Sequence, residues 1–460
     1  MTHNATVPLK RTSISNTAEG ALVLAREAES PRASKLTANQ RRGFLAAWGG
    51  WALDGMDASI YALVLVPTLT ELLPASGIPA TAGNIGYYGS ILFALFLLGW
   101  GLSMIWGPIS DRIGRVRALM LTIICYSLFT FLCGFVTTIW QLAVLRVLCG
   151  LGIGGEQPVG STYIAEELPE DRRVMGAGLM HTGYYVGFIL AALANYFIGA
   201  EYGWRWMFFV GGLPALLVGY IRYGVRESAA WTRRFDRSQL EVDQERPSMR
   251  KSFAAIFSSE YRRRTAVMSA LFLVSIIGFW GGSVYVPTSV TQMAMRSGAS
   301  AGDAARLASY GSIVLACGTI LGCVLAPVLA ERWGRRPAMA MYLTILALTI
   351  GLGFGYLFYI DGALPSYFAL LFVLGIGGAN FAMYTIWLPE LYATHCRASA
   401  FGFIASVGRF VGVVMVFVIG AGISSFGSLG VPVAITAVAP VLGLVVLLFS
   451  AETKGVRLPA

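Results

Sequence analysis

The sequence predicts an all-α membrane protein, with about twelve transmembrane helices in two pseudo-symmetric six-helix bundles. Of its 460 residues, 56% are hydrophobic and only 13% are charged, whereas a soluble domain carries about 25% charged residues. Stretches of about 20 mostly apolar residues, long enough to cross a bilayer, recur from Phe44 to Ser450. Sequence signals from the first half return in the same order in the second. Composition, apolar stretches and repetition together predict this fold.

The apolar stretches give the order of the elements. An N-terminal six-helix bundle is expected over 43–225 and a C-terminal bundle over 265–450. The breaks between stretches predict spans at 44–66, 84–106, 117–139, 141–163, 174–198, 205–225, 265–290, 306–330, 338–359, 366–388, 399–422 and 430–450.

Polar segments flank and separate the bundles. Residues 1–42 are rich in Thr, Ser, Ala and Arg and are expected to form a disordered cytoplasmic tail, and 451–460 a second cytoplasmic tail. The segment 226–264 is expected to be a cytoplasmic linker. It can form a helix at the lipid headgroups or remain flexible, and the sequence leaves both alternatives open.

Basic residues indicate the side of the membrane on which each loop lies, because Lys and Arg concentrate in cytoplasmic loops. With the N-terminus inside, the cytoplasmic loops contain Arg112, Arg115, Arg117, Arg172, Arg173, Arg332, Arg335, Arg336 and the basic residues of 222–264. The opposite loops contain almost none beyond Arg205, Arg296 and Arg306. Both termini are therefore expected on the cytoplasmic side of a bacterial inner membrane. The net charge of +10 marks that side, and no nucleic-acid partner is expected.

Matching motifs indicate that one half of the chain duplicates the other. GPISDRIGRVR at 107–117 corresponds to APVLAERWGRRP at 326–337, and LGIGGEQ at 151–157 corresponds to LGIGGAN at 374–380. Further on, the matched residues are Glu166 with Glu390, Arg173 with Arg397 and Gly178 with Gly402. Paired six-helix halves around a midplane site are the architecture of an alternating-access carrier.

These motifs resemble those of the major facilitator superfamily over essentially the whole membrane portion. The run at 107–117 resembles the superfamily's loop motif between the second and third helices. RVLCGLG at 146–152 resembles its fourth-helix motif, and AETKG at 451–455 resembles the ETKG ending common among sugar-porter relatives.

A narrower resemblance points to one group within the superfamily. WALDGMDASIYALVL at 51–65 and GWRWMFFVGGLPALL at 203–217 are similar to the sialate, lactate and aromatic-acid proton symporters. The chain departs from the sialate type at Gln157 and Pro158, where those relatives often carry Trp after Gly-Gly-Glu. The resemblance implies proton-coupled uptake and leaves the substrate open.

Four ionisable residues within the predicted spans are candidates for proton coupling: Asp54, Asp57, Arg146 and Glu156. An ionisable group at the centre of a membrane helix costs about 2.5–3.5 kcal/mol on insertion scales, so it needs a partner or water. Asp57 and Arg146 have compatible depths and are expected to pair in at least one state. One carboxylate is expected to load and release the proton, which is the coupling ion; a permanent ion pair is the alternative. Glu156 can act as a proton carrier or as a gate.

Arg409 is the candidate substrate-binding residue. It lies mid-span with no acidic residue on its own helix within several turns, and its planar guanidinium suits a carboxylate. A substrate carboxylate is the simplest partner, and an aspartate of the first helix is the alternative. Further side chains expected in the pocket are those of Tyr87, Tyr184, Tyr285, Asn380 and Tyr384. Each aromatic residue taken alone is better explained by packing.

Charged residues in the cytoplasmic loops are expected to form two gate clusters. The first comprises Asp111, Arg112, Arg115, Glu166 and Arg173, and the second Glu331, Arg332, Arg335, Glu390 and Arg397. Such clusters can hold the cytoplasmic side closed and break when it opens. Exposed pairs would each contribute only about 0–1 kcal/mol, whereas a partly buried network can bias the two states.

Other functional classes find little support in the sequence. GLGIGG at 150–155 contains a literal GxGxxG, but it lies inside an apolar helical span, so no dinucleotide site is expected. No Walker loop, HExxH or GxSxG occurs, and the six cysteines show no metal-site spacing. We expect neither an enzyme nor a cofactor.

The sequence as a whole favours a secondary active transporter, expected to be a monomer in the lipid bilayer. It would bring a small organic anion, a monocarboxylate or aromatic acid, into the cell with protons by alternating access. An antiporter or uniporter of a related metabolite is the first alternative. A transporter-like sensor is the second, although it would be expected to carry a large signalling domain.

Overall fold

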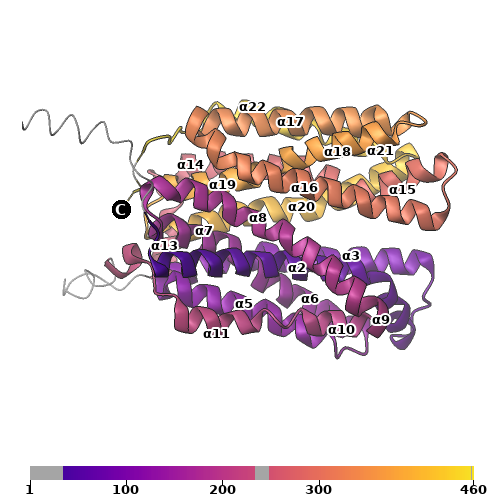
Figure 1. The fold of residues 1–460 in the computed structure, drawn as a ribbon, viewed down its shortest axis with the longest axis horizontal. Coiled ribbons are helices and arrows are strands. Elements are labelled where there is room, and N and C mark those ends of the chain that lie inside the picture. The colour runs from indigo at the N-terminus through magenta and orange to yellow at the C-terminus, as the bar shows by residue number, and fades with distance from the viewer. Residues whose placement is uncertain (1–34, 234–247, 457, 460) are drawn as a thin grey trace, which may run out of the picture.

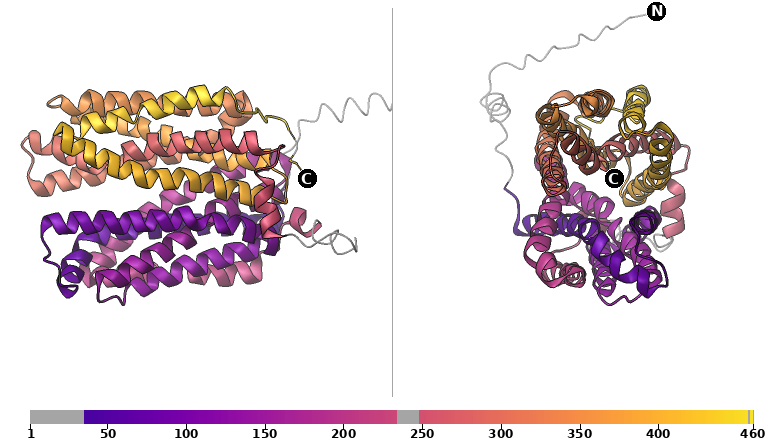
Figure 2. Two further views of the ribbon diagram at one scale, coloured as in Figure 1. Left: turned by 180° about the vertical axis from the view of Figure 1, so that it is seen from behind. Right: turned by 90° about the vertical axis from the view of Figure 1, so that its right-hand side faces the viewer.

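The structure is a computed structural model, and it describes residues 35–233, 248–456 and 458–459. Two bundles of helices lie side by side along the long axis of the molecule (Figure 1), and the end-on view in Figure 2 shows them as two separate groups. The described residues contain no strand. The predicted all-α fold is confirmed.

The N-terminal bundle contains the first six membrane-crossing stretches. Its helices are α2 (Ala38–Ala75), α3 (Ala82–Leu102), α4 (Trp106–Ile113), α5 (Arg115–Cys133), α6 (Ile139–Ile153), α7 (Glu156–Glu167), α8 (Glu170–Ala194), α9 (Ala200–Tyr202), α10 (Trp204–Val210) and α11 (Ala215–Gly224). Short segments of other helical geometry, at Ser103–Ile105 and Asn195–Gly199, continue α3 and α8.

The C-terminal bundle repeats this arrangement. Its helices are α14 (Arg262–Ser283), α15 (Val286–Arg296), α16 (Ala301–Trp333), α17 (Arg335–Gly355), α18 (Leu364–Gly378), α19 (Asn380–Leu391), α20 (Arg397–Phe426), α21 (Gly430–Ile435) and α22 (Val438–Leu447). A short helix, α13 (Met249–Ala255), precedes it.

Twelve helical stretches in the described ranges are long and apolar enough to cross a membrane, and each corresponds to one predicted span. Several are built from two helices joined without a loop. The fourth span, Ile139–Glu167, joins α6 to α7, and the tenth, Leu364–Leu391, joins α18 to α19. These two stretches contain the duplicated LGIGG motif at the junction.

The duplication also extends to backbone conformation. Gly114 and Gly334 occupy the loops between α4 and α5 and between α16 and α17, with φ angles of 104° and 105°. L residues with side chains rarely adopt a positive φ, so the sharp turn requires glycine in both halves. The predicted match between the two loop motifs is confirmed at the level of geometry.

Glycines allow helices to approach closely at the crossings inside each bundle. A Cβ atom built on Gly187 of α8 would lie 2.0 Å from the Ala52 carbonyl oxygen of α2, and one on Gly55 would lie 2.2 Å from the Tyr184 carbonyl oxygen. Small residues commonly bring membrane helices into such contact. The crossing of α2 and α8 fixes the position of the aspartates on α2.

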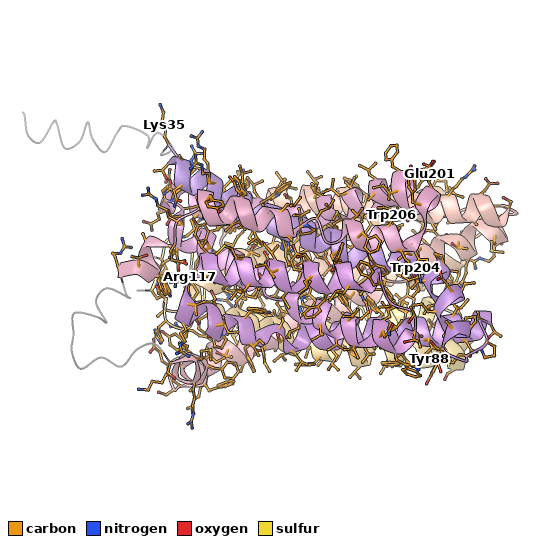
Figure 3. The ribbon with its side chains drawn as sticks, turned by 90° about the horizontal axis from the view of Figure 1, so that it is seen from below. Lys35, Tyr88, Arg117, Glu201, Trp204 and Trp206 are labelled. Carbon is orange, nitrogen blue, oxygen red and sulfur yellow. The ribbon has the colours of Figure 1, made fainter. Side chains whose placement is uncertain are left out.

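Basic and aromatic residues mark opposite ends of the molecule. In Figure 3, Lys35 and Arg117 lie at one end of the long axis, whereas Glu201, Trp204 and Tyr88 lie toward the other. Basic residues on one side and aromatic residues at the other interface are typical of a protein that crosses a bilayer. Helix α13 and the C-terminal end of the chain lie at the basic end (Figure 1).

The predicted polar segments are partly corrected. Helix α2 begins at Ala38, capped by Thr37, so 38–42 belong to the first helix rather than to a tail. In the linker, Ile256 is fully buried and Phe257 packs against Phe403 of α20, with ring centres 5.0 Å apart. This part of the linker therefore rests on protein. The rest of the predicted tail, 1–34, and the linker residues 234–247 lie outside the described residues.

Candidate functional site

Two aspartates of α2 lie inside the N-terminal bundle. Asp54 and Asp57 are fully buried, and because they are three residues apart they lie on nearly the same face of the helix. None of their four carboxylate oxygens has a hydrogen-bond partner in the described part of the chain. Buried polar groups nearly always have partners. The fold thus leaves two acidic groups available for a proton or another partner.

Arg409 of α20 reaches from the C-terminal bundle to the N-terminal one. Its buried side chain donates a hydrogen bond from Nη2 to Oε1 of Gln157 on α7, at 3.3 Å. The guanidinium carbon lies 4.6 Å from the ring centre of Trp100 on α3, a cation–π contact. Nη1 has no partner among the described residues. Asp54 lies within electrostatic range but forms no hydrogen bond with Arg409.

Arg146 of α6 is enclosed by aromatic rings. Its guanidinium carbon lies 4.4 Å from the ring centres of both Tyr61 and Phe96. None of its guanidinium nitrogens hydrogen bonds to a described residue. The expected pair of Asp57 and Arg146 is therefore absent from this conformation, because the ring faces hold the guanidinium. The two groups remain within electrostatic range of each other.

Glu156 begins α7 and is fully buried in the same bundle. One carboxylate oxygen contacts the hydroxyl of Thr122 on α5. The other lies against Gly50 of α2 and has no hydrogen-bond partner in the described structure. Glu156 therefore lies one turn of α2 away from Asp54, on the cytoplasmic side.

Aromatic contacts extend the site on both sides of Arg409. Trp280 of α14 packs against Trp100, with ring centres 5.6 Å apart, and Tyr184 of α8 packs against Trp51 of α2 at 4.8 Å. Tyr184 also lies within electrostatic range of Arg409. Among the predicted pocket residues, Tyr184 is the one that the structure places beside the guanidinium.

Two further predicted residues lie inside the C-terminal bundle. The Tyr384 hydroxyl hydrogen bonds with that of Ser275, at 2.8 Å. Asn380 donates from Nδ2 to the Gly377 carbonyl oxygen at 3.1 Å, while its Oδ1 has no partner among the described residues. Tyr384 is thus explained by packing, and Asn380 keeps one polar atom for a ligand.

The structure does not bring the remaining two pocket candidates to Arg409. Tyr285 is half-buried where α14 meets α15, and no hydrogen bond or ring contact joins it to Arg409 within the described ranges. Tyr87 is 63% exposed and packs edge-on against Tyr88. The prediction for Tyr87 is corrected, because it lies about 20 Å along α3 from Trp100 at a rise of 1.5 Å per residue.

Sequence reasoning missed Gln157 and Trp100. Gln157 stood out only as a departure from sialate-type sequences, and that departure marks the contact with Arg409. Trp100 is one of 11 tryptophans and has no distinctive local context. Both were missed because their role depends on how the two bundles meet.

A second cluster of charges joins the bundles at the basic end of the molecule. We call it the latch; it comprises Asp111, Arg115, Glu166, Arg397 and Ser399. Arg115 forms ion pairs with Asp111 and Glu166, both at 2.9 Å, and all three side chains are fully buried. Glu166 accepts a second ion pair from Arg397 of α20 at 2.8 Å. Glu166 thus bridges a basic residue from each bundle.

Further hydrogen bonds strengthen this connection. Asp111 accepts from the backbone N–H of Ser399 at 3.1 Å and from its hydroxyl at 2.5 Å, and Arg115 donates to the Thr394 carbonyl oxygen at 2.9 Å. The predicted grouping of Arg397 with Glu390 is corrected, since Arg397 pairs with the other bundle. In this conformation the basic ends of the two bundles are held together.

The second predicted cluster stays within the C-terminal bundle. Arg335 pairs with Glu390 at 2.7 Å and with the exposed Glu331 at 3.1 Å. Three other predicted gate residues form no ion pair in the described part of the chain: Arg112, Arg173 and Arg332. Arg112 and Arg332 are exposed, which corrects their assignment to the buried clusters.

Equivalent residues of the linker and the C-terminal segment cap the two turns. Glu227 accepts from the backbone N–H groups of Arg115 and Val116, and Glu452 accepts from those of Arg335 and Arg336. The following hydroxyls donate to the buried glutamates: Ser228 to Glu166 at 2.6 Å and Thr453 to Glu390 at 2.5 Å. We call the pairs 227–228 and 452–453 the straps.

The two straps differ in electrostatics. Burial raises the pKa of the Glu227 carboxyl above its ordinary value, despite its backbone hydrogen bonds. Burial also acts on Glu452, but hydrogen bonds from backbone N–H groups outweigh it and lower the pKa of that carboxyl. The hydrogen bonds around Glu452 therefore favour the ionised form of its carboxyl group.

Comparison with known proteins identifies the family. Residues 47–350 match the Major Facilitator Superfamily. The chain belongs to the Major Facilitator Superfamily. Members of this family are membrane transporters, so the protein is a multi-pass membrane transporter of small metabolites and not an enzyme. The resemblance stated from the loop and fourth-helix motifs is confirmed.

Individual superfamily members show the same relationship. The chain is 29% identical to a probable 4-methylmuconolactone transporter of Cupriavidus pinatubonensis, over 91% of this chain and 92% of the relative. It is 27% identical to the niacin transporter of Acinetobacter baylyi, over 79% and 83% of the two chains. The fold matches that of the proton:xylose symporter XylE with a TM-score of 0.73 and 20% identity, covering 91% of this chain and 98% of that one.

Proposed function

We propose that this superfamily member carries an organic anion, a monocarboxylate or an aromatic acid, into the cell together with protons. The observation that carries the proposal is Arg409: a buried guanidinium at the meeting of the two bundles, with Nη1 unpartnered in the described structure. A buried positive charge is costly without an anionic partner. A substrate carboxylate between Arg409 and the residues beside it would supply that partner.

The chemistry around Arg409 suits a planar acid. The indole of Trp100 lies under the guanidinium, and Trp280 and Tyr184 continue the aromatic surface. Aromatic side chains favour offset stacking or edge contacts with a flat apolar group. The names of the two relatives, a niacin transporter and a probable 4-methylmuconolactone transporter, support a small ring-containing metabolite.

Proton coupling would use Asp54 and Asp57. Both carboxyls are buried without hydrogen-bond partners among the described residues, and each lies within electrostatic range of one arginine, Arg409 for Asp54 and Arg146 for Asp57. A change in the position of either arginine would alter the proton affinity of its aspartate. Binding of the anion to Arg409 would therefore favour protonation of Asp54, and this linkage couples the two fluxes.

The direct test is uptake into proteoliposomes that contain the purified protein. Labelled nicotinate, benzoate, lactate and sialate would be offered with and without an inward proton gradient. We expect a gradient to drive accumulation of at least one acid, and Asp54→Asn or Asp57→Asn to abolish accumulation while retaining exchange. Asp361→Asn, at an exposed site, is the matched control. Accumulation that ignores the proton gradient, or that survives in both aspartate variants, would refute the assignment.

A further inference from the structure

One face of α5 carries three hydroxyl groups along the interior of the N-terminal bundle. Thr122, Tyr126 and Thr130 are spaced four residues apart, so they lie above one another on the same side of the helix. All three are fully buried. At 1.5 Å per residue the row extends over about 12 Å along the helix. We call this row the hydroxyl ladder.

A buried carboxyl lies at each end of the ladder. At the cytoplasmic end, Glu156 contacts the Thr122 hydroxyl. At the other end, a Cβ atom built on Gly211 would lie 2.4 Å from the Thr130 methyl group and 3.2 Å from Oδ1 of Asp57. The side chains of Thr130 and Asp57 therefore both lie against Gly211. The ladder therefore connects the level of Glu156 with that of Asp57.

The middle hydroxyl lies among three acids. The Tyr126 hydroxyl is within electrostatic range of Glu156, Asp54 and Asp57, and it has no hydrogen-bond partner in the described structure. Glu156 rests against Gly50, and Gly50 lies one turn before Asp54 on α2. A phenol hydroxyl can donate one hydrogen bond and accept another, so the Tyr126 hydroxyl could relay a proton between these acids.

The hydrogen bonds at Thr122 favour a protonated Glu156. Its single hydroxyl contacts two acceptors, the Leu119 carbonyl oxygen at 2.8 Å and the Glu156 carboxyl. One proton cannot satisfy both contacts, and a carbonyl cannot donate. If Thr122 donates to Leu119, a protonated Glu156 completes the set by donating to Thr122.

We propose that Asp57, Tyr126, Asp54 and Glu156, together with the Thr122 hydroxyl that contacts Glu156, form a proton path within the N-terminal bundle, with Glu156 as its cytoplasmic end. A proton taken up at the aspartates would pass by way of the Tyr126 hydroxyl, which accepts one proton as it donates another. It would leave from Glu156 when the cytoplasmic side opens. The charged groups facing the path are Arg409 at Asp54 and Arg146 at Asp57. The path contains no substrate-binding residue, since Arg409 belongs to the other bundle.

This inference rests on the proposed proton symport, and its test separates the two. The first measurement needs no substrate: infrared spectra of the purified protein at neutral pH, which report the carbonyl band of protonated carboxylic acids. We expect Glu156→Gln to remove one such band that the wild-type protein shows at neutral pH. An unchanged set of bands would overturn the assignment of Glu156.

The second measurement compares proton-driven accumulation with exchange in proteoliposomes, using the labelled acid that the wild-type protein accumulates. Tyr126→Phe and Thr122→Val remove one hydroxyl each and change the shape little. We expect each to reduce proton-driven accumulation about tenfold or more, as loss of a proton-transfer group does, and to reduce exchange by less than about twofold. Tyr342→Phe in the C-terminal bundle, whose hydroxyl bonds to the Gly322 carbonyl oxygen, is the matched control.

The outcomes are distinct. If the wild-type protein accumulates no acid with a proton gradient, the proposed function fails. If it does, but Tyr126→Phe accumulates as well as Tyr342→Phe, the path fails alone. Accumulation driven by a sodium gradient in place of protons would also overturn the path, because it would assign the same oxygens to a metal cation.

Discussion

The guanidinium of Arg409, from the C-terminal bundle, is held in place by two side chains of the N-terminal bundle. Its guanidinium stacks on Trp100 and bonds to Gln157, and both partners belong to the other bundle. These contacts orient the planar group and leave Nη1 free of any described partner. Nη1 could then donate a charge-assisted hydrogen bond to a substrate carboxylate.

Substitution of Arg409 tests this arrangement. We expect Arg409→Lys to weaken substrate binding moderately, because the charge remains but the planar fork is lost, and Arg409→Ala to weaken it by about 100-fold or more. Equilibrium binding of the transported acid to purified protein measures both. Unchanged affinity in Arg409→Ala would remove this residue from the site.

Gln157 offers a sharper test of charge selection. In Gln157→Glu a carboxylate replaces the amide that accepts from Arg409, so the variant supplies an internal anion that competes with the substrate. We expect affinity to fall about tenfold or more, with recovery on acidification as the new carboxyl becomes neutral. Gln157→Asn, which keeps the amide, should bind more tightly than Gln157→Glu at neutral pH. The reverse order would contradict the proposed site.

Helix crossings depend on residues that sequence patterns reveal poorly. The α2–α8 crossing needs Gly187 because its Cα lies against the Ala52 carbonyl. We expect Gly187→Val to destabilise the protein by about 1–3 kcal/mol or more, since the helices must separate. Thermal unfolding in detergent, followed by fluorescence-detected size exclusion, measures the effect. Gly219→Val is the control, because no atom lies within 4 Å of a Cβ at that position.

We expect the latch to influence which side of the molecule is open. Arg397→Ala leaves Glu166 with one cation in place of two, and breaking a buried ion pair costs about 3–5 kcal/mol. That cost falls on the conformation with closed cytoplasmic ends, so we expect faster hydrogen exchange in α7 and the first turns of α20, and slower transport with little change in affinity. The same outcome is expected for Asp111→Ala and Arg115→Ala. Arg335→Ala, whose pair with Glu390 lies within one bundle, should open the interface less.

For the helices and turns, the sequence was sufficient to predict the features that depend on local or repeated patterns. Apolar length predicted every span, and the duplicated motifs predicted the matching turns at Gly114 and Gly334. The partners of Arg397 were not predictable, because its own half offers Glu390 at the expected spacing while Glu166 comes from the other bundle. Arg146 was predicted to meet an acid, but aromatic rings from α2 and α3 surround it.

For the whole molecule, the straps provide a response to acid. The pKa of Glu452 is lowered in the folded protein, so its contribution to stability is present above the unfolded pKa and is lost as pH falls through the folded value. Glu227 has a raised pKa in the folded protein, so its contribution to stability is present below the unfolded pKa and is lost as pH rises through the folded value. We expect wild-type protein to lose thermal stability as the pH falls below about 4, and Glu452→Gln to lose less over that interval. An equal acid-induced loss in Glu452→Gln would exclude Glu452 as a cause.

The arrangement of the whole molecule could be predicted further than the site. Repetition and basic loops predicted two six-helix bundles with the charged loops at one end, as Figure 3 shows. The site combines side chains from α2, α3, α7, α8 and α20, and its composition depends on the angle at which the bundles meet. That angle is set by many weak packing contacts, none of which leaves a pattern in the sequence.

The burial of Glu166 and Arg115 has a consequence for the medium in which the transporter works. Dissolved ions screen exposed charges over about 10 Å at 0.1 M salt, but they do so far less for pairs that water does not reach. Both side chains, and that of Asp111, are fully shielded. The ion pairs that hold the closed form together should therefore weaken little as the salt concentration rises.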